Sequence, residues 1–123
     1  MNRFDLEERL IDFAVSVIDV SEKLPKTFAG NHIAGQLVRS GTSPAFNYGE
    51  AQSAESRADF IHKMKVSAKE LRESYNCLRI ILKKNWFQEE KLKSILNENN
   101  QLISIFVKSI ETARKNNIKQ KSG

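Results

Sequence analysis

The segment from Arg39 to Glu50 limits the possible folds of this chain more than any other. It contains two glycines and one of the chain's two prolines, yet helical spacing of apolar and small residues continues through it. The residues that share this heptad stripe are Gly30, Ala34, Leu37, Gly41, Pro44, Tyr48 and Ala51. Propensity alone would break such a helix, so tertiary packing must hold it, and Pro44 is expected to kink it. The small residues predict that another helix approaches closely.

Three further amphipathic helices are predicted around this segment, because apolar residues recur at heptad spacing on both sides of it. The first helix is expected from about Asp5, where Asp5 and Glu8 have capping-box spacing, to a turn at 24–27. The second is expected over about 27–52 and the third from 56 to about 84. The fourth is expected from 89, with an apolar stripe that reaches 113. No alternating strand pattern is present. Short connections make consecutive helices antiparallel, so the chain is predicted to be all-α, an antiparallel up-down-up-down four-helix bundle. It forms one domain over residues 1–123, whose polar tail, 116–123, is expected to fray.

The first helix carries two apolar stripes, which is more than one bundle seam needs. The longer stripe consists of Leu6, Leu10, Phe13, Val17, Val20 and Leu24, and the second consists of Phe4, Ile11, Ala14 and Ile18. Either one stripe faces the core and the other a neighbouring subunit, or both lie in the core of a monomer. In the fourth helix Asn99 interrupts the stripe, and it either fixes the register of the bundle or lies at the surface.

Composition and charge narrow the class of protein. The formal net charge of +5 favours anionic partners such as nucleic acid or acidic proteins, although simple solubility explains it equally well. The single cysteine, Cys77, excludes an intrachain disulfide. No apolar run is long enough to span a membrane and the N-terminus has no apolar signal region, so a cytoplasmic protein without a membrane partner is expected.

Catalytic and metal-binding patterns are weak. A di-iron site in a bundle needs two Glu-x-x-His pairs and two further carboxylates, whereas this chain has only Asp59-x-x-His62 and Glu70-x-x-Glu73. Cys77 has no base that the sequence can identify, and no glycine-rich phosphate loop follows a strand. The sequence therefore favours no enzyme, and no catalytic residue, metal or cofactor is assigned.

A polar cluster is expected beside the core of the second and third helices. If Glu70 points inward near Asn47 and Arg39, the buried carboxylate needs a cation, and Arg39 is the obvious partner. Ser43, Asn47 and Glu50 lie on one stripe of the second helix, and Glu73 lies one turn from Glu70. The cluster either fixes the register of the bundle or forms a ligand site.

Basic residues form a second candidate surface on the third helix. One stripe, separate from the core stripe, consists of Lys65, Lys69, Arg72, Asn76, Arg79 and Lys83. A line of cations at this spacing can follow a phosphate backbone, unless Glu70 and Glu73 neutralise it and it is only a solvated face. A second basic cluster at the C-terminus consists of Arg114, Lys115, Lys119 and Lys121. No exposed aromatic residues alternate with either patch, so any binding is expected to depend on charge or shape.

Three runs of residues together resemble a bacterial family: Gln36 to Ala51, Ser56 to Lys63, and Lys69 to Leu78. The family comprises the four-helix-bundle proteins encoded by intervening sequences of large-subunit ribosomal RNA genes. Its pattern of Ser-Gly-Thr-Ser, then Asn and Glu, then two acidic positions corresponds here to 40–43, Asn47, Glu50, Glu70 and Glu73. The chain departs from the pattern at Pro44, where a β-branched residue is usual, and at Gly49, where a charged residue is common.

The resemblance implies a bundle that assembles into a ring-shaped homopentamer and has no known catalytic activity. A more distant bundle, the accessory protein of diversity-generating retroelements, binds nucleic acid, and it suggests the same association here. Two main hypotheses follow: a homo-oligomer that binds RNA or DNA through charge, or an adaptor that binds another protein. A metal-dependent enzyme is the third.

Overall fold

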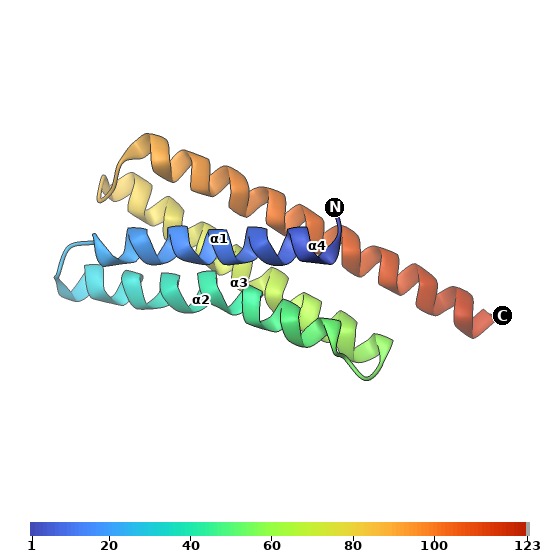
Figure 1. The fold of residues 1–123 in the computed structure, drawn as a ribbon. Helices are drawn as coiled ribbons and strands as arrows, with labels where there is room; N and C mark the ends of the chain where they lie inside the picture. Colours follow the sequence, from blue (N-terminus) through green and yellow to red (C-terminus); the bar gives the residue numbers. More distant parts are fainter. Residues whose placement is uncertain (123) are drawn as a thin grey trace.

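The computed structural model describes the backbone of residues 1–122 and the side chains of residues 1–116. Its four helices are α1 (Arg3–Glu22), α2 (Phe28–Gln52), α3 (Arg57–Lys84) and α4 (Glu89–Ser122), and residues 1–122 contain no strand. Consecutive helices run in opposite directions, and each packs against the next (Figure 1). The predicted all-α, antiparallel four-helix bundle is confirmed.

The N-terminal cap of α1 differs from the prediction. Asn2 accepts hydrogen bonds from the backbone N–H groups of Phe4 and Asp5, and the Asp5 carboxylate accepts one from the N–H of Asn2. Asp5 is therefore at the N3 position of the capping box and not at its N-cap, so the predicted pairing of Asp5 with Glu8 is wrong.

The other helix ends agree with the sequence. Thr27 caps α2 by accepting a hydrogen bond from the N–H of Gly30, and Ser56 caps α3 by accepting one from Asp59, each at 3.0 Å. Asn85 ends α3 in the left-handed conformation, with φ of 56°, which an asparagine tolerates better than most residues.

Helix α2 continues without interruption through Pro44, and its axis bends about halfway along (Figure 1). The proline ring lacks an N–H group and crowds the carbonyl four residues before it, which opens the helix at this point. The hydroxyls of Thr42 and Ser43 donate to the carbonyls of Val38 and Arg39, at 2.7 and 2.6 Å, and such bonds often bend helices. The predicted kink thus has two physical causes.

Small residues let α2 approach its neighbours closely. A Cβ atom added to Gly41 would lie 2.6 Å from Cγ1 of Val17 on α1, and one added to Gly30 would collide with the carbonyl of Pro25. All the predicted stripe residues of α2 are buried except Ala34, which is half-buried. Packing by α1 and α3 therefore holds the helix, as its weak propensity requires.

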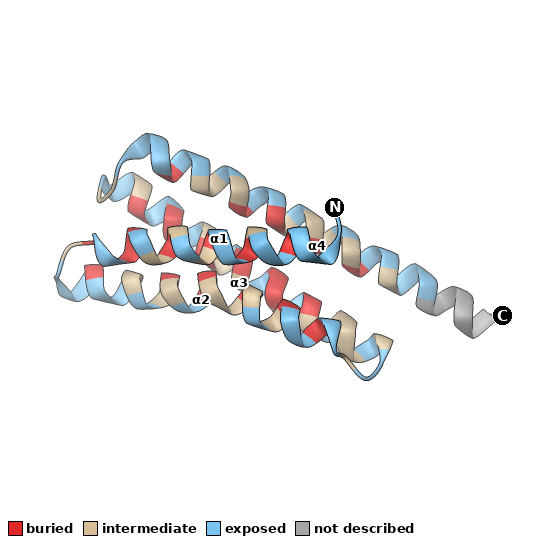
Figure 2. Cartoon of the chain, viewed as in Figure 1, coloured by how far each residue is buried: buried red, intermediate tan, exposed pale blue. Residues whose placement is uncertain are grey.

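The core lies along the inward stripes of the four helices (Figure 2). Every residue of the longer α1 stripe is buried, whereas Phe4 and Ile11 of the second stripe are exposed and Ala14 and Ile18 are half-buried. The interpretation that both stripes lie in the core of a monomer is therefore wrong. Val15 is also exposed, so α1 presents an apolar outer face.

Asn99 lies fully inside the core, so the interpretation that it lies at the surface is wrong. Its side-chain amide donates to the carbonyl of Leu71 at 2.9 Å, and its oxygen lies 3.1 Å from the hydroxyl of Ser74. Because both partners belong to α3, this pair of contacts ties α4 to α3 at one register.

The end of the bundle that contains the N-terminus is open. Helix α1 has 20 residues while α3 has 28, so α1 is about 12 Å shorter. Helices α1 and α4 also make the fewest contacts of any neighbouring pair, and the ion pair of Arg9 with Glu98 joins them.

Helix α4 continues past Ala113, where its apolar stripe ends. The predicted fraying falls on residues 116–123, whose side chains beyond Asn116 lie outside the described residues.

Candidate nucleic-acid interface

All the cationic side chains of the predicted α3 stripe are exposed. They are Lys65, Lys69, Arg72, Arg79 and Lys83, and Asn76 between them is exposed as well. At about 1.5 Å per residue, the stripe extends for about 27 Å along the helix. The positions of these residues therefore leave their charges available to an anionic partner.

Two of these cations meet a residue of the other basic cluster in a groove between α3 and α4. Lys65 and Arg72 of α3 and Arg114 of α4 line this groove, which has a volume of about 350 Å³. Its remaining lining consists of Ala68, Val107, Ile110 and Glu111. The groove thus has an apolar floor with three cations and one carboxylate around it, and we refer to it as the basic groove.

The two acidic residues that could have neutralised the stripe have another partner. Glu70 and Glu73 lie 3.4 and 3.0 Å from the guanidinium of Arg39 on α2. Among the described side chains, no ion pair engages Lys65, Arg72 or Arg114 within 4.0 Å. Glu111 is therefore the only described acidic residue that lines the basic groove.

The structure separates the predicted polar cluster into parts. Arg39 binds Glu70, Glu73 and also Gln36, at 2.6 Å, but 53% of its side chain is exposed, so the network lies at the edge of the α2–α3 seam and is not buried in the core. Ser43 bonds only to the backbone, and in the described part of the chain Asn47 and Glu50 make no hydrogen bond to the network. The expected pairing of Arg39 with Glu70 beside the core is present. Ser43 and Asn47 are half-buried and Glu50 is exposed, and these three residues do not join the network.

The buried polar contacts occur elsewhere, between Ser74 and Asn99. The sequence identified Asn99 by its interruption of an apolar stripe, but nothing marked Ser74 as its partner. The sequence also gives no sign that Arg114 approaches Lys65, because the two residues lie on different helices and belong to separate basic runs. Lys115 is exposed on α4, and Lys119 and Lys121 lie outside the described side chains.

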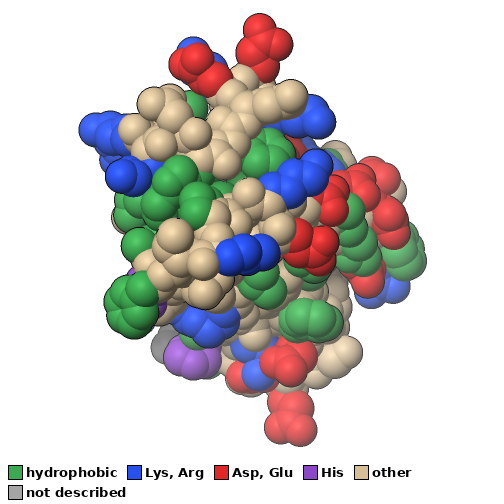
Figure 3. Space-filling model, turned by 90° about the vertical axis from the view of Figure 1, so that its left-hand side faces the viewer, with side chains coloured by type: hydrophobic (Ala, Val, Ile, Leu, Met, Phe, Trp, Pro, Cys, Tyr) green, Lys and Arg blue, Asp and Glu red, His purple; other side chains and the backbone are tan. Residues whose placement is uncertain are grey.

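Charge is distributed differently on the far end of the molecule. Figure 3 looks onto the end with the α1–α2 and α3–α4 connections, where acidic and basic side chains are interspersed with hydrophobic ones. Where charges of opposite sign are mixed in this way, they weaken the electrostatic field that an anionic partner would experience. The basic groove is thus a local feature, and the excess of cations is not spread evenly.

Groups capable of catalysis are sparse in the described part of the chain. No cluster of three or more potential metal ligands occurs among the described residues. Cys77 is buried in α3, and burial, helped by the nearby Glu73, raises the pKa of its thiol, which keeps it protonated and weakly reactive near neutral pH. Within the described residues, no helix has both the length and the apolar character needed to cross a membrane.

The fold and the groove define a class of protein: an all-α four-helix bundle with a small basic groove and an apolar outer face on α1. Residues 3–108 match the family model described as 23S rRNA-intervening sequence protein, so the chain belongs to that family. The resemblance identified from its motifs is confirmed.

A crystal structure supports the same fold. It is of a protein with unknown function from the S23 ribosomal protein family of Bacteroides thetaiotaomicron, with 28% sequence identity and a TM-score of 0.82. The similarity covers 90% of this chain and 99% of that one. Among curated proteins, none is similar enough in sequence to count as a relative.

Proposed function

We propose that this protein is a non-catalytic, homo-oligomeric bundle that binds RNA or DNA through charge at the basic groove and the adjoining stripe of α3. The observation that carries the proposal is the meeting of Lys65, Arg72 and Arg114 in one groove, without ion-pair partners among the described side chains. A groove with unpaired cations can release counterions from a phosphate backbone, which is the main source of sequence-independent affinity.

RNA is the first partner to test, since the family is described by its connection with 23S rRNA. The cytoplasm is the compartment in which ribosomal RNA of a bacterium is found, so the proposal assigns the protein to it. Lys69, Arg79, Lys83 and Lys115 are exposed near or along the same surface and would contact further phosphates. The proposal requires no cofactor or metal.

The decisive experiment measures the affinity of the full chain for an RNA hairpin over a range of salt concentrations. We expect the logarithm of the association constant to fall linearly as the logarithm of salt concentration rises. The variant K65E/R72E/R114E should bind weakly, and its salt slope should be smaller by about 2 to 3, because each lost phosphate contact removes about 0.7 to 0.9. Circular dichroism establishes that its helices remain.

A matched control separates the groove from net charge. The variant K26E/K84E/K91E changes the same number of exposed cations to acidic residues outside the groove. It should retain most of the affinity for RNA. Equal loss of binding in both variants, or binding by the wild type that does not depend on salt, would contradict the proposal.

An adaptor that binds another protein is the second candidate, and the exposed apolar residues favour it. Phe4, Ile11 and Val15 are exposed on α1, and Phe28 and Phe46 are exposed on α2. Faces of this kind usually contact another protein surface. We propose that the α1 face is a contact between copies of this chain, in a homopentamer as the family resemblance implies; recovery of a different protein and no nucleic acid would favour the adaptor.

A further inference from the structure

A second groove lies at the open end of the bundle, on the other side of the α3–α4 seam. It consists of two adjoining hollows, of about 640 and 570 Å³, which share Gln52, Phe60 and Ser109 as lining residues. It exists because the N-terminal end of α1 stops short of the α2–α3 connection, while α4 continues beyond that connection (Figure 1). We refer to it as the end groove.

The charged residues that line the end groove are all cations. They are Arg57 in the larger hollow and Arg3 and Lys108 in the smaller one, and neither hollow has an acidic residue in its lining. Asp59, the nearest acidic residue along α3, is paired with Lys63 at 3.4 Å. An anionic group that entered the groove would therefore meet no described carboxylate on its walls.

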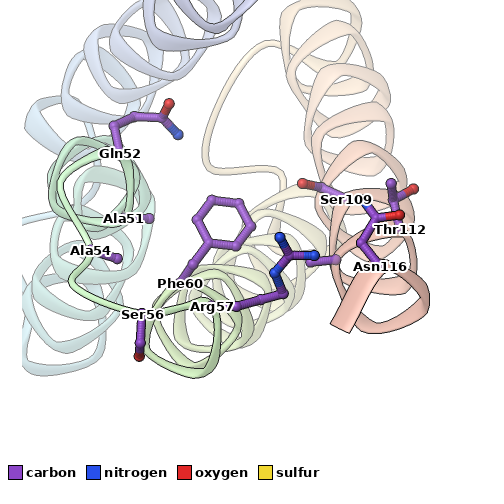
Figure 4. A pocket seen from close by; sticks show the side chains of 10 residues that line it. Ala51, Gln52, Ala54, Ser56, Arg57, Phe60, Ser109, Thr112 and Asn116 are labelled. Carbon is purple, nitrogen blue, oxygen red and sulfur yellow. The ribbon is translucent and has the colours of Figure 1, made fainter. Parts of the chain in front are cut away.

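Arg57 is the cation best placed to bind such a group. Its side chain extends into the gap between the α2–α3 connection and α4, on the side where Ser109 and Asn116 lie (Figure 4). Arg57 is half-buried, and among the described residues its guanidinium has no hydrogen-bond or ion-pair partner. A planar guanidinium with free donors binds phosphate through two parallel hydrogen bonds.

Phe60 stands beside Arg57 and lines both hollows (Figure 4). Its ring is half-buried, so one part packs against the core while another part borders the groove. Aromatic rings in such positions are platforms on which nucleobases stack, whatever the base. Gln52, Ser109 and Asn116 add polar groups that can bond to the edge of a base or to a ribose.

We propose that the end groove binds one nucleotide unit, with its base stacked on Phe60 and its phosphate held by Arg57. The volume of the larger hollow lies within the usual range for small-molecule sites, about 300 to 1,000 Å³. The unit is either a free nucleotide or the terminal nucleotide of an RNA strand. This inference deepens the proposed function, but it uses none of the residues of the basic groove.

The test uses the full chain and three probes: AMP, adenosine and inorganic phosphate, followed by amide NMR spectra. AMP should shift the signals of Gln52, Arg57, Phe60 and Ser109. Adenosine and phosphate should each bind at least about fivefold more weakly, because each lacks one of the two contacts. Phosphate that binds as tightly as AMP would reduce the site to a simple anion site and overturn the proposal, and so would the absence of any shift with AMP.

Variants assign the two contacts. Arg57→Gln and Phe60→Leu should each weaken AMP binding at least about fivefold, whereas Phe60→Tyr, which keeps the ring, should not. Lys84→Gln, which changes an exposed cation at the far end of α3, is the matched control and should leave AMP binding unchanged. If Phe60→Leu fails to fold, the comparison of Phe60→Tyr with Arg57→Gln still decides, since loss of AMP binding in Phe60→Tyr alone would contradict stacking.

Two further arms separate the sources of the nucleotide and the two proposals. If a strand end is the natural ligand, a 5′-phosphorylated oligo(A) strand binds more tightly than AMP, and if a free nucleotide is, AMP binds more tightly. The variant K65E/R72E/R114E should lose affinity for the RNA hairpin and keep its affinity for AMP. Loss of RNA binding at the basic groove therefore leaves the end groove independently testable.

Discussion

Gly41 is the residue at which the path of α2 depends most directly on one missing atom. Its Cα faces Val17 on α1 so closely that a Cβ atom would lie 2.6 and 2.8 Å from the two methyl carbons of that side chain. Val17 is fully buried and β-branched, so it has little freedom to move away. The glycine therefore sets how closely α1 and α2 pack.

Replacement of Gly41 should destabilise the fold, whereas replacement of Gly35 or Gly49 in the same helix should not. Gly41→Ala should lower the free energy of unfolding by about 1 to 3 kcal/mol, because the methyl group overpacks the seam. Gly35 and Gly49 have open space around their Cα atoms, so Gly35→Ala and Gly49→Ala should raise it by about 0.5 to 1 kcal/mol. Urea denaturation measures all three; a stabilised Gly41→Ala would contradict the close approach.

At the scale of the element, the register of α4 against α3 depends on one amide. Asn99 Nδ2 donates to the carbonyl of Leu71, and Asn99 Oδ1 lies within hydrogen-bond distance of Ser74 Oγ. A shift of α4 by one turn would bury this amide without partners, at a cost of about 1 to 3 kcal/mol. The apolar residues around it would tolerate such a shift more easily, because they interact without direction.

The substitution Asn99→Ala should lower the free energy of unfolding by about 2 kcal/mol, since it removes the hydrogen bond and leaves a cavity. Asn97→Ala, at an exposed position two residues earlier, should change it by less than about 0.5 kcal/mol. Asn99→Leu should cost less than Asn99→Ala but should broaden the NMR signals of α4, because alternative registers become accessible. Sharp signals and full stability in Asn99→Leu would show that packing alone sets the register.

Periodicity predicted the elements well because each helix has one inward stripe. Leu10, Leu37, Leu71 and Phe106 are fully buried as their spacing indicated, or nearly so. The capping of α1 by Asn2 was missed because Asp5 with Glu8 presents the same local pattern one turn later. Local sequence cannot distinguish two adjacent capping boxes when packing selects between them.

The candidate sites were less predictable, because they depend on how helices of different length meet. The sequence marked Lys65 and Arg72 as one stripe, but only the continuation of α4 brings Arg114 beside them. Nothing in the local sequence marks Arg57 and Phe60 as a site, since their significance depends on α1 being too short to cover them. The pairing of Arg39 with Glu70 was predictable, because it needs only two adjacent helices and a carboxylate that lies beside the core.

At the scale of the whole molecule, the outer face of α1 is the surface that exposes a row of apolar side chains. Phe4, Ile11 and Val15 are exposed there, although the longer stripe of the same helix already fills the core. Single exposed apolar residues are ordinary, but a row of three on one helix face is typical of a surface covered by another chain. The proposed homopentamer would bury this row in five equivalent contacts, since a ring repeats one heterologous interface.

Size-exclusion chromatography with light scattering tests this assembly directly. The wild-type protein should have five times the mass of the 14.1 kDa chain. The variant F4Q/I11Q/V15Q should have the mass of one chain, because it removes the apolar area while leaving the buried stripe intact. Ile80→Gln, which changes an exposed apolar residue on α3, should keep the wild-type mass. A monomeric wild type would exclude the ring. A pentameric F4Q/I11Q/V15Q variant would place the contact between copies on another face. The absorbance of the same peak at nucleic-acid wavelengths reports whether nucleic acid accompanies the protein.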